Sequence, residues 1–188
     1  ADYLETGDTS LLYVMADMDA LAHIENHILK YNRDLMDSKI NIVKKLLSPR
    51  EEKMKILPEF RRNIGFAIKE IAETDLPQTE CLKYLPSGFT FNSTLFFSFG
   101  YDIGVVYWNN ASINLANKIF ITDPNELKYY AIHELHHAAF VSLKDNEMPS
   151  LEISTYGQMA ELIAYFTQLE GMGTYAPLNL RMKENAMN

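Results

Sequence analysis

The chain has 188 residues, of which 47% are hydrophobic and 22% charged, and its formal net charge is -8. This composition allows one globular domain with a substantial core, and the acidic balance disfavours nucleic acid and anionic membranes as partners. The single cysteine, Cys81, excludes an intrachain disulfide and is interpreted as a buried small hydrophobe. No apolar run reaches the roughly 18 residues that span a bilayer. We therefore expect a soluble protein, cytoplasmic or secreted, whose start at Ala1 instead of Met indicates a processed or truncated N-terminus.

The first part of the chain has a helical pattern. Apolar residues recur at intervals of three and four between residues 9 and 73. Ser48-Pro49 interrupts this run, because proline disfavours helix for the residue before it, and a further helix is expected to begin near Pro58. Residues 1–75 are therefore predicted to form a helical N-terminal subdomain of three or four packed helices.

The middle of the chain is rich in aromatic and β-branched residues. Short strands are predicted at residues 89–99, 103–108, 112–115 and 118–122, with turn-like sequences between them. Together they predict a small, largely antiparallel sheet and an α+β fold. Residues 76–87, which contain two prolines, are interpreted as the connection between the helical and mixed parts of one integrated domain.

A helix is predicted to follow the last of these strands. Asp123 suits the N-cap, Pro124 the first helical position, and Glu126 the third, where its carboxylate can reach the free amide of the cap. The pattern predicts a helix that continues through Leu143.

The middle of this helix contains the pattern His-Glu-x-x-His, formed by His133, Glu134 and His137. Residues four apart lie on one face of a helix, so the two imidazoles can bind one metal ion while the glutamate reaches a water on that ion. A catalytic Zn²⁺ takes three protein ligands and keeps one position open. His133 and His137 are therefore predicted as two ligands, and Glu134 as a general base.

The third ligand must be a carboxylate, because no histidine follows His137. The main downstream choices are Glu147, Glu152, Glu161 and Glu170. A last helix, predicted from residue 149 or 155 toward Pro177, places Glu161 and Glu170 on opposite faces. The face around Glu170 is interpreted as packed, where a carboxylate needs a partner, so we favour Glu170. Glu161 remains the alternative, since its separation of 24 residues from His137 is nearer to the shorter spacings found in some zinc peptidases.

The segment His-Glu-Leu-His-His, followed by Leu-Glu-Gly-Met-Gly-Thr-Tyr at residues 169–175, resembles gluzincin-type zinc metallopeptidases. It is most similar to bacterial zinc-dependent peptidase families with His-Glu-x-His-His and a later Glu-Gly-x-Ala-like segment. The resemblance covers about residues 102–175, with Gly173 in place of the usual alanine.

This resemblance implies Glu170 as the third ligand and a zincin-like catalytic portion within residues 76–188, whose active-site helix packs beneath the sheet. It also implies cleavage of a peptide or protein substrate. Zinc would activate a water molecule, and Glu134 would transfer its proton to the leaving amine.

An oxyanion formed in this reaction needs a hydrogen-bond donor. The candidates are Tyr156, Tyr165, Tyr175 and His136, although packing is the favoured role for any single tyrosine. His136 is expected to lie behind the metal ligands or at the surface, and not to bind the metal itself. The predicted strand at residues 118–122 would offer its edge to an extended peptide.

A second group of histidines, His23 and His27 with Asp19, has helical spacing. It would form a weak metal site or face the catalytic cleft, but a solvent-exposed helix face is the favoured interpretation. Two alternatives to a peptidase stay open. One is a non-catalytic zincin-like binding protein, and the other is a metal hydrolase that acts on a non-peptide amide or ester. The sequence does not predict the oligomeric state.

Overall fold

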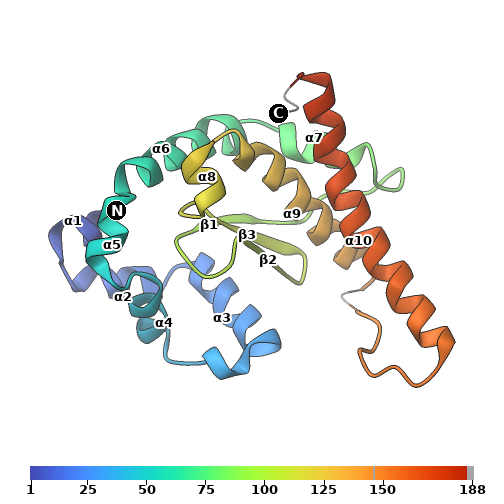
Figure 1. Cartoon of the computed structure of the whole chain (residues 1–188), viewed down its shortest axis with the longest axis horizontal. Coiled ribbons are helices and arrows are strands. Elements are labelled where there is room, and N and C mark those ends of the chain that lie inside the picture. Colours follow the sequence, from blue (N-terminus) through green and yellow to red (C-terminus); the bar gives the residue numbers. More distant parts are fainter. Residues whose placement is uncertain (146, 186–188) are drawn as a thin grey trace.

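The computed structural model describes residues 1–145 and 147–185. Helices surround a small three-stranded sheet, which makes the fold α+β as predicted (Figure 1). In chain order the elements are α1 (Asp2–Thr6), α2 (Ser10–Ala16), α3 (Asp19–Tyr31), the 3₁₀ helix η1 (Arg33–Leu35), α4 (Lys39–Leu46), α5 (Arg50–Lys55), α6 (Leu57–Ala67), the π-helix η2 (Ile68–Ala72), α7 (Leu76–Leu82), β1 (Leu95–Ser98), β2 (Gly104–Tyr107), β3 (Asn110–Asn114), α8 (Lys118–Thr122), α9 (Glu126–Leu143) and α10 (Tyr156–Lys183). No helix within the described residues is both long and apolar enough to cross a bilayer.

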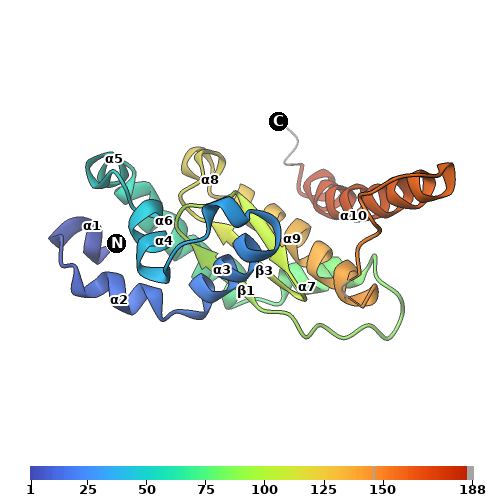
Figure 2. The same cartoon turned by 90° about the horizontal axis from the view of Figure 1, so that it is seen from below.

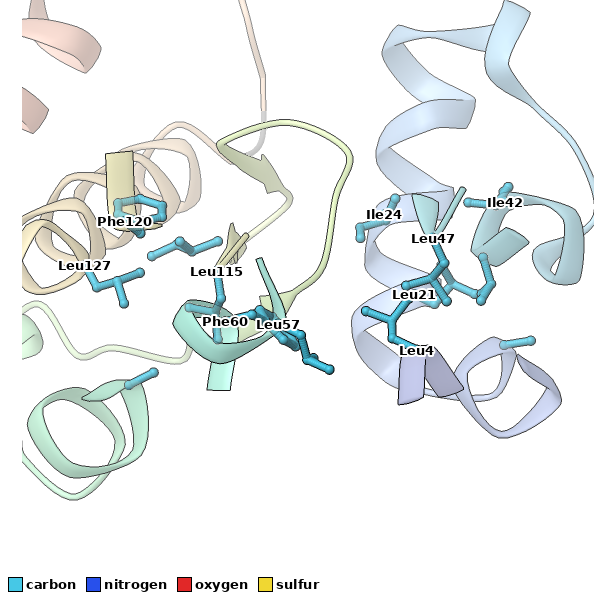
Figure 3. Packing of buried hydrophobic residues seen from close by; sticks show 14 of the residues in the cluster. Leu4, Leu21, Ile24, Ile42, Leu47, Leu57, Phe60, Leu115, Phe120 and Leu127 are labelled. Carbon is cyan, nitrogen blue, oxygen red and sulfur yellow. The ribbon is translucent and has the colours of Figure 1, made fainter. Parts of the chain in front are cut away.

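The N-terminal part is helical, as its apolar spacing predicts, but it consists of more and shorter helices than the three or four expected. Ser48-Pro49 separates α4 from α5, and Pro58 lies in the first turn of α6. Leu4 in α1 and Ile42 in α4 belong to the same buried cluster as Leu127 in α9 (Figure 3). The helical part therefore shares a core with the part that carries the histidine motif.

The sheet is mixed and not largely antiparallel. Its strand order is β1-β3-β2, with β1 parallel and β2 antiparallel to β3. The loop between β1 and β2 passes through Gly100 and Tyr101, both at positive φ, and leaves the central position free for β3. Only residues 95–98 of the predicted strand at 89–99 are in the sheet. Two helices hold this sheet, since α3 packs against all three strands and α9, on the other side, packs against β2 and β3 (Figures 1 and 2).

The predicted strand at residues 118–122 is wrong, because this segment is the helix α8. The side chain of Asn117 accepts a hydrogen bond from the amide of Ile119 at 3.0 Å and caps the helix. Phe120 is fully buried while Ile119 is exposed. This pattern is typical of a short helix that lies on the surface with one face toward the core. The segment therefore offers no strand edge to a peptide. The predicted connection at residues 76–87 is also wrong in part, because α7 occupies its first half and packs against α9.

The helix that carries the motif ends at Leu143 as predicted but begins two residues later than predicted, because its N-cap is Asn125 instead of Asp123 and no side chain caps it. Asp123 accepts a hydrogen bond from the amide of Asn125 at 2.9 Å, and α9 then runs from Glu126 to Leu143. The last helix, α10, begins with a capping box between Thr155 and Gln158 and continues through Pro177 to Lys183. It crosses α9 and packs along it, which brings a second helix to the motif (Figure 1).

Candidate metal centre

The motif on α9 meets a glutamate on α10. Oε2 of Glu170 lies 3.7 Å from Nε2 of His133 and 3.4 Å from Nε2 of His137. The ligand atoms of these three residues all lie within 4.8 Å of one another, and they form the one such group found among the described residues. Helical geometry accounts for the two histidines, whose ring centroids are 4.2 Å apart.

These separations fit a shared zinc ion. Two ligand atoms held tetrahedrally at about 2.0–2.1 Å from zinc are about 3.3 Å apart. The distances from Glu170 to the two histidines, 3.4 and 3.7 Å, are close to this value. The donor set of two imidazoles and one carboxylate is also a common one for catalytic zinc. The residues therefore fit the metal that the sequence motif implies.

One atom of this group needs a partner that the described protein atoms do not provide. Nε2 of His137 is buried and has no hydrogen bond. Burial lowers the pKa of His137 to about 3 and also lowers the pKa of His133. Both rings are therefore neutral near pH 7, which is the form that binds a metal. A cation between these rings would satisfy the buried nitrogen.

Gly173 allows α10 to approach the two histidines. A Cβ atom at this position would lie 2.8 Å from Nε2 of His137 and 3.3 Å from Nδ1 of His133. Contacts this short force an imidazole or a helix to move. The absence of a side chain at Gly173 is therefore what lets the Glu170 carboxylate reach the histidines from the next helix.

The backbone of Gly173 also forms a hydrogen bond with His133. This hydrogen bond raises the pKa of His133, but the larger effect of burial lowers it. The Gly173 carbonyl is available because Pro177, four residues later, has no N–H to occupy it within the helix. Such hydrogen bonds from metal-binding histidines fix the orientation of the ring. This leaves Nε2 of His133 directed at Glu170.

Glu134 is buried beside the histidines, with only 4% of its surface exposed. Its carboxylate packs against Gly104 of β2, where a Cβ atom would lie 2.4 Å from Oε1 of Glu134 and 2.7 Å from the ring of Tyr130. Burial raises the pKa of Glu134 to about 8, while a hydrogen bond with Tyr130 lowers it and the charge of Glu170 raises it. The sheet therefore leaves room for this carboxylate only because residue 104 is glycine.

Sequence reasoning missed Tyr130. Its ring stacks on His133 with centroids 5.4 Å apart and an interplanar angle of 26°. The signal was available, because Tyr130 precedes His133 by three positions and Glu134 by four on the same helix, and residues at those spacings are neighbours. Tyr130 thus contacts both the predicted base, Glu134, and one predicted ligand, His133.

The other predicted residues lie elsewhere. Glu161 is exposed on α10 and, together with Glu147, lines a separate hollow, so neither belongs to the metal group. Tyr156 is 93% exposed, and Tyr175 packs edge-on against Tyr84. The remaining predicted donors, Tyr165 and His136, are both buried.

Tyr165 packs against Phe140, while Nδ1 of His136 has no hydrogen-bond partner among the described residues. The surface position considered for His136 is therefore wrong, because this side of α9 faces the interior.

The second histidine group is not an exposed helix face. His23 is buried and its Nε2 lies 3.3 Å from the carbonyl oxygen of Val105, because α3 packs onto the sheet. His27 is half-buried, and its Nδ1 lies 2.9 Å from the hydroxyl of Tyr101. These histidines form no metal group within the described part of the chain. His27 instead lines a hollow that His137 also lines, while His23 and Asp19 are not among the described residues around it.

Comparison with protein-family models, with curated proteins and with solved structures found no match to this chain.

Proposed function

We propose that this protein is a zinc-dependent hydrolase of peptide bonds with a zincin-like catalytic portion. In this proposal His133, His137 and Glu170 bind Zn²⁺, and Glu134 is the general base. The observation that carries it is the convergence of the three ligand atoms, which lie within 4.8 Å of one another although they come from two helices. The resemblance of the motif to gluzincin-type peptidases supports the same assignment.

The chemistry follows from the residue types. A zinc ion held here would supply a nucleophilic water at neutral pH and polarise the scissile carbonyl. Glu134 follows His133 directly and is the carboxylate of the motif that is not assigned as a ligand. We assign it to accept the proton of the attacking water and to deliver that proton to the leaving amine.

Tyr130 supports this role of Glu134. It contacts both the ring of His133 and the position at Gly104 where the Glu134 carboxylate packs. Burial raises the pKa of the Tyr130 hydroxyl, so that it remains a donor that can hydrogen-bond to the Glu134 carboxylate and orient it. We therefore assign Tyr130 as a positioning residue for the base.

A comparison of two conservative variants tests the proposal. The zinc-loaded wild type, Glu134→Gln and the matched control Glu161→Gln are incubated with a mixed peptide library, and products are identified by mass spectrometry. We expect Glu134→Gln to retain zinc and to lose about 10²-fold or more of the cleavage rate, which is the usual contribution of a general base. Glu161→Gln should retain both.

Two results would oppose the assignment. Cleavage by Glu134→Gln at the wild-type rate would show that Glu134 is not the base. A zinc-loaded wild type that cleaves no peptide would overturn the peptidase assignment, and esters and non-peptide amides would then separate another hydrolase from a binding protein.

A further inference from the structure

A cavity of about 220 Å³ adjoins the candidate metal centre on the side of His137. We call it the His137 hollow. Its walls come from α3, β2, the β2–β3 turn, α9 and α10, and include Lys30, Tyr31, Val106, Trp108, His137 and Leu169. A helix of the N-terminal part therefore forms one wall of a cavity that reaches a predicted zinc ligand.

The lining of the hollow is apolar and aromatic. Trp108 and Tyr31 are 54% and 46% exposed, although both are large side chains that water solvates poorly. No carboxylate lines this cavity within the described part of the chain, and its one charged side chain is the cation of Lys30. Lys30 lies 5.0 Å above the ring of Tyr31. This lining favours an uncharged aromatic or long apolar group and disfavours a cationic one.

The backbone at Trp108 supports a role for this side chain. Its φ angle is 55° in the tight turn between β2 and β3, a left-handed conformation that glycine or asparagine adopts more readily than a bulky residue. Strained positions of this kind are concentrated at ligand sites. The turn thus keeps an indole at the rim of the hollow in a conformation that the fold alone does not favour.

The size and position of the hollow define its occupant. Its volume is below the roughly 300–1,000 Å³ of pockets that hold a whole small molecule, so it suits one side chain. A second hollow, of about 190 Å³, is lined by the other histidine of the metal group, His133, together with Thr174 and Leu178. A substrate that lies across the metal group can therefore place one side chain in the His137 hollow.

We propose that the His137 hollow is the specificity pocket of this hydrolase and takes one aromatic or long apolar side chain next to the scissile bond. This inference rests on the proposed function. It gives α3 a part in substrate selection, with Tyr31 and Trp108 as the aromatic contacts and Lys30 as the residue that repels cationic side chains.

Acyl hydroxamates, which bind zinc through the hydroxamate group, separate the metal centre from the pocket. Binding of acetohydroxamate, 3-phenylpropionohydroxamate and 6-aminohexanohydroxamate to zinc-loaded protein is measured by calorimetry. We expect the phenyl compound to bind at least tenfold more tightly than acetohydroxamate. The amino compound should bind no more tightly than acetohydroxamate. Trp108 is the only tryptophan in the sequence. Its fluorescence should therefore change with the phenyl compound and not with acetohydroxamate.

Variants of the two aromatic contacts complete the test. Tyr31→Ala and Trp108→Gly should each remove most of the additional affinity for 3-phenylpropionohydroxamate over acetohydroxamate. Acetohydroxamate binding and zinc content should not change. Glycine is chosen at residue 108 because it tolerates the positive φ. The exposed Tyr13 on α2 provides the matched control, and Tyr13→Ala should bind all three compounds as the wild type does.

The outcomes distinguish the two proposals. If zinc or acetohydroxamate does not bind, the proposed function fails. If acetohydroxamate binds but the phenyl group adds no affinity, or if both variants keep its advantage, the specificity pocket is overturned while the metal centre stands.

Discussion

Replacement of Gly173 by alanine tests how the metal group is assembled. The added Cβ would lie 2.8 Å from Nε2 of His137, whereas ordinary contacts begin near 3.4 Å. The imidazole or α10 must therefore move by about 0.6 Å, which exceeds the roughly ±0.2 Å within which metal–ligand distances are held. We expect Gly173→Ala to weaken zinc binding by about 10- to 100-fold, the range seen when the surroundings of metal ligands are altered.

Gly171 provides the matched control on the same helix, because a Cβ atom there would meet nothing within 4 Å. Gly171→Ala should leave zinc affinity unchanged and raise the free energy of unfolding by about 1 kcal/mol, since alanine favours helix more than glycine. Zinc dissociation constants are measured by competition with a fluorescent chelator, and urea unfolding of the metal-free proteins checks the fold. Wild-type zinc affinity in a folded Gly173→Ala protein would refute the reasoning.

Three further predictions concern groups outside the metal centre. Arg181 donates hydrogen bonds to both carboxylate oxygens of Glu126 and so links α10 to α9. Replacement of Arg181 by alanine should lower the free energy of unfolding by about 1–2 kcal/mol, whereas replacement of the exposed Arg61 by alanine should lower it by at most about 0.5 kcal/mol. Equal losses of the two variants in urea titrations would contradict this prediction. Burial lowers the pKa of His27 from 6.5 to about 4, so the unfolded chain binds a proton at His27 before the folded protein does as pH falls. The free energy of unfolding should therefore decline between pH 6.5 and pH 4. His27→Gln should make this decline smaller, and the same pH profile in the variant would count against the prediction. Burial raises the pKa of the Cys81 thiol to about 12, so a thiol reagent at pH 8 should label it only after unfolding, and fast labelling of the native protein would disprove its burial.

The motif helix could be predicted from the sequence because its signals are local. Asp123 and Pro124 predict a helix start near the observed N-cap, Asn125. His133, Glu134 and His137 have a spacing that brings their side chains together only on a helix. The interpretation of Cys81 as buried is confirmed by an exposed fraction of 0%. In each case a short window of residues contained the information.

The sequence favours Glu170 for a reason that the structure does not support. It predicts a packed face of α10 around Glu170, yet this side chain is 57% exposed, and Ile163 on the same face is 60% exposed. The first two turns of α10 project away from the other helices, and the first buried residue of α10 is Tyr165, which packs on Phe140 of α9 (Figure 1). The close approach at Gly173 brings Glu170 to the histidines, and helix periodicity does not encode such a contact.

The errors in the sheet have a similar origin. Residues 118–122 are rich in β-branched and aromatic side chains, which favours a strand. The burial of Phe120 and the cap at Asn117 stabilise a helix instead. The parallel pairing of β1 with β3 depends on the path of the intervening loop, which propensity does not specify. His23 also looks polar in sequence and is buried only because α3 lies on the sheet.

In the proposed metal centre, His133, His137 and Glu170 together hold one zinc ion. Elemental analysis of zinc-loaded, dialysed protein tests it most directly, with Glu170→Ala compared with Glu161→Ala on the same helix. We predict about one zinc per chain in the wild type and in Glu161→Ala, and a strong reduction in Glu170→Ala, because a catalytic zinc takes three protein ligands. Full zinc content in Glu170→Ala, or its loss in Glu161→Ala, would contradict the proposed metal centre.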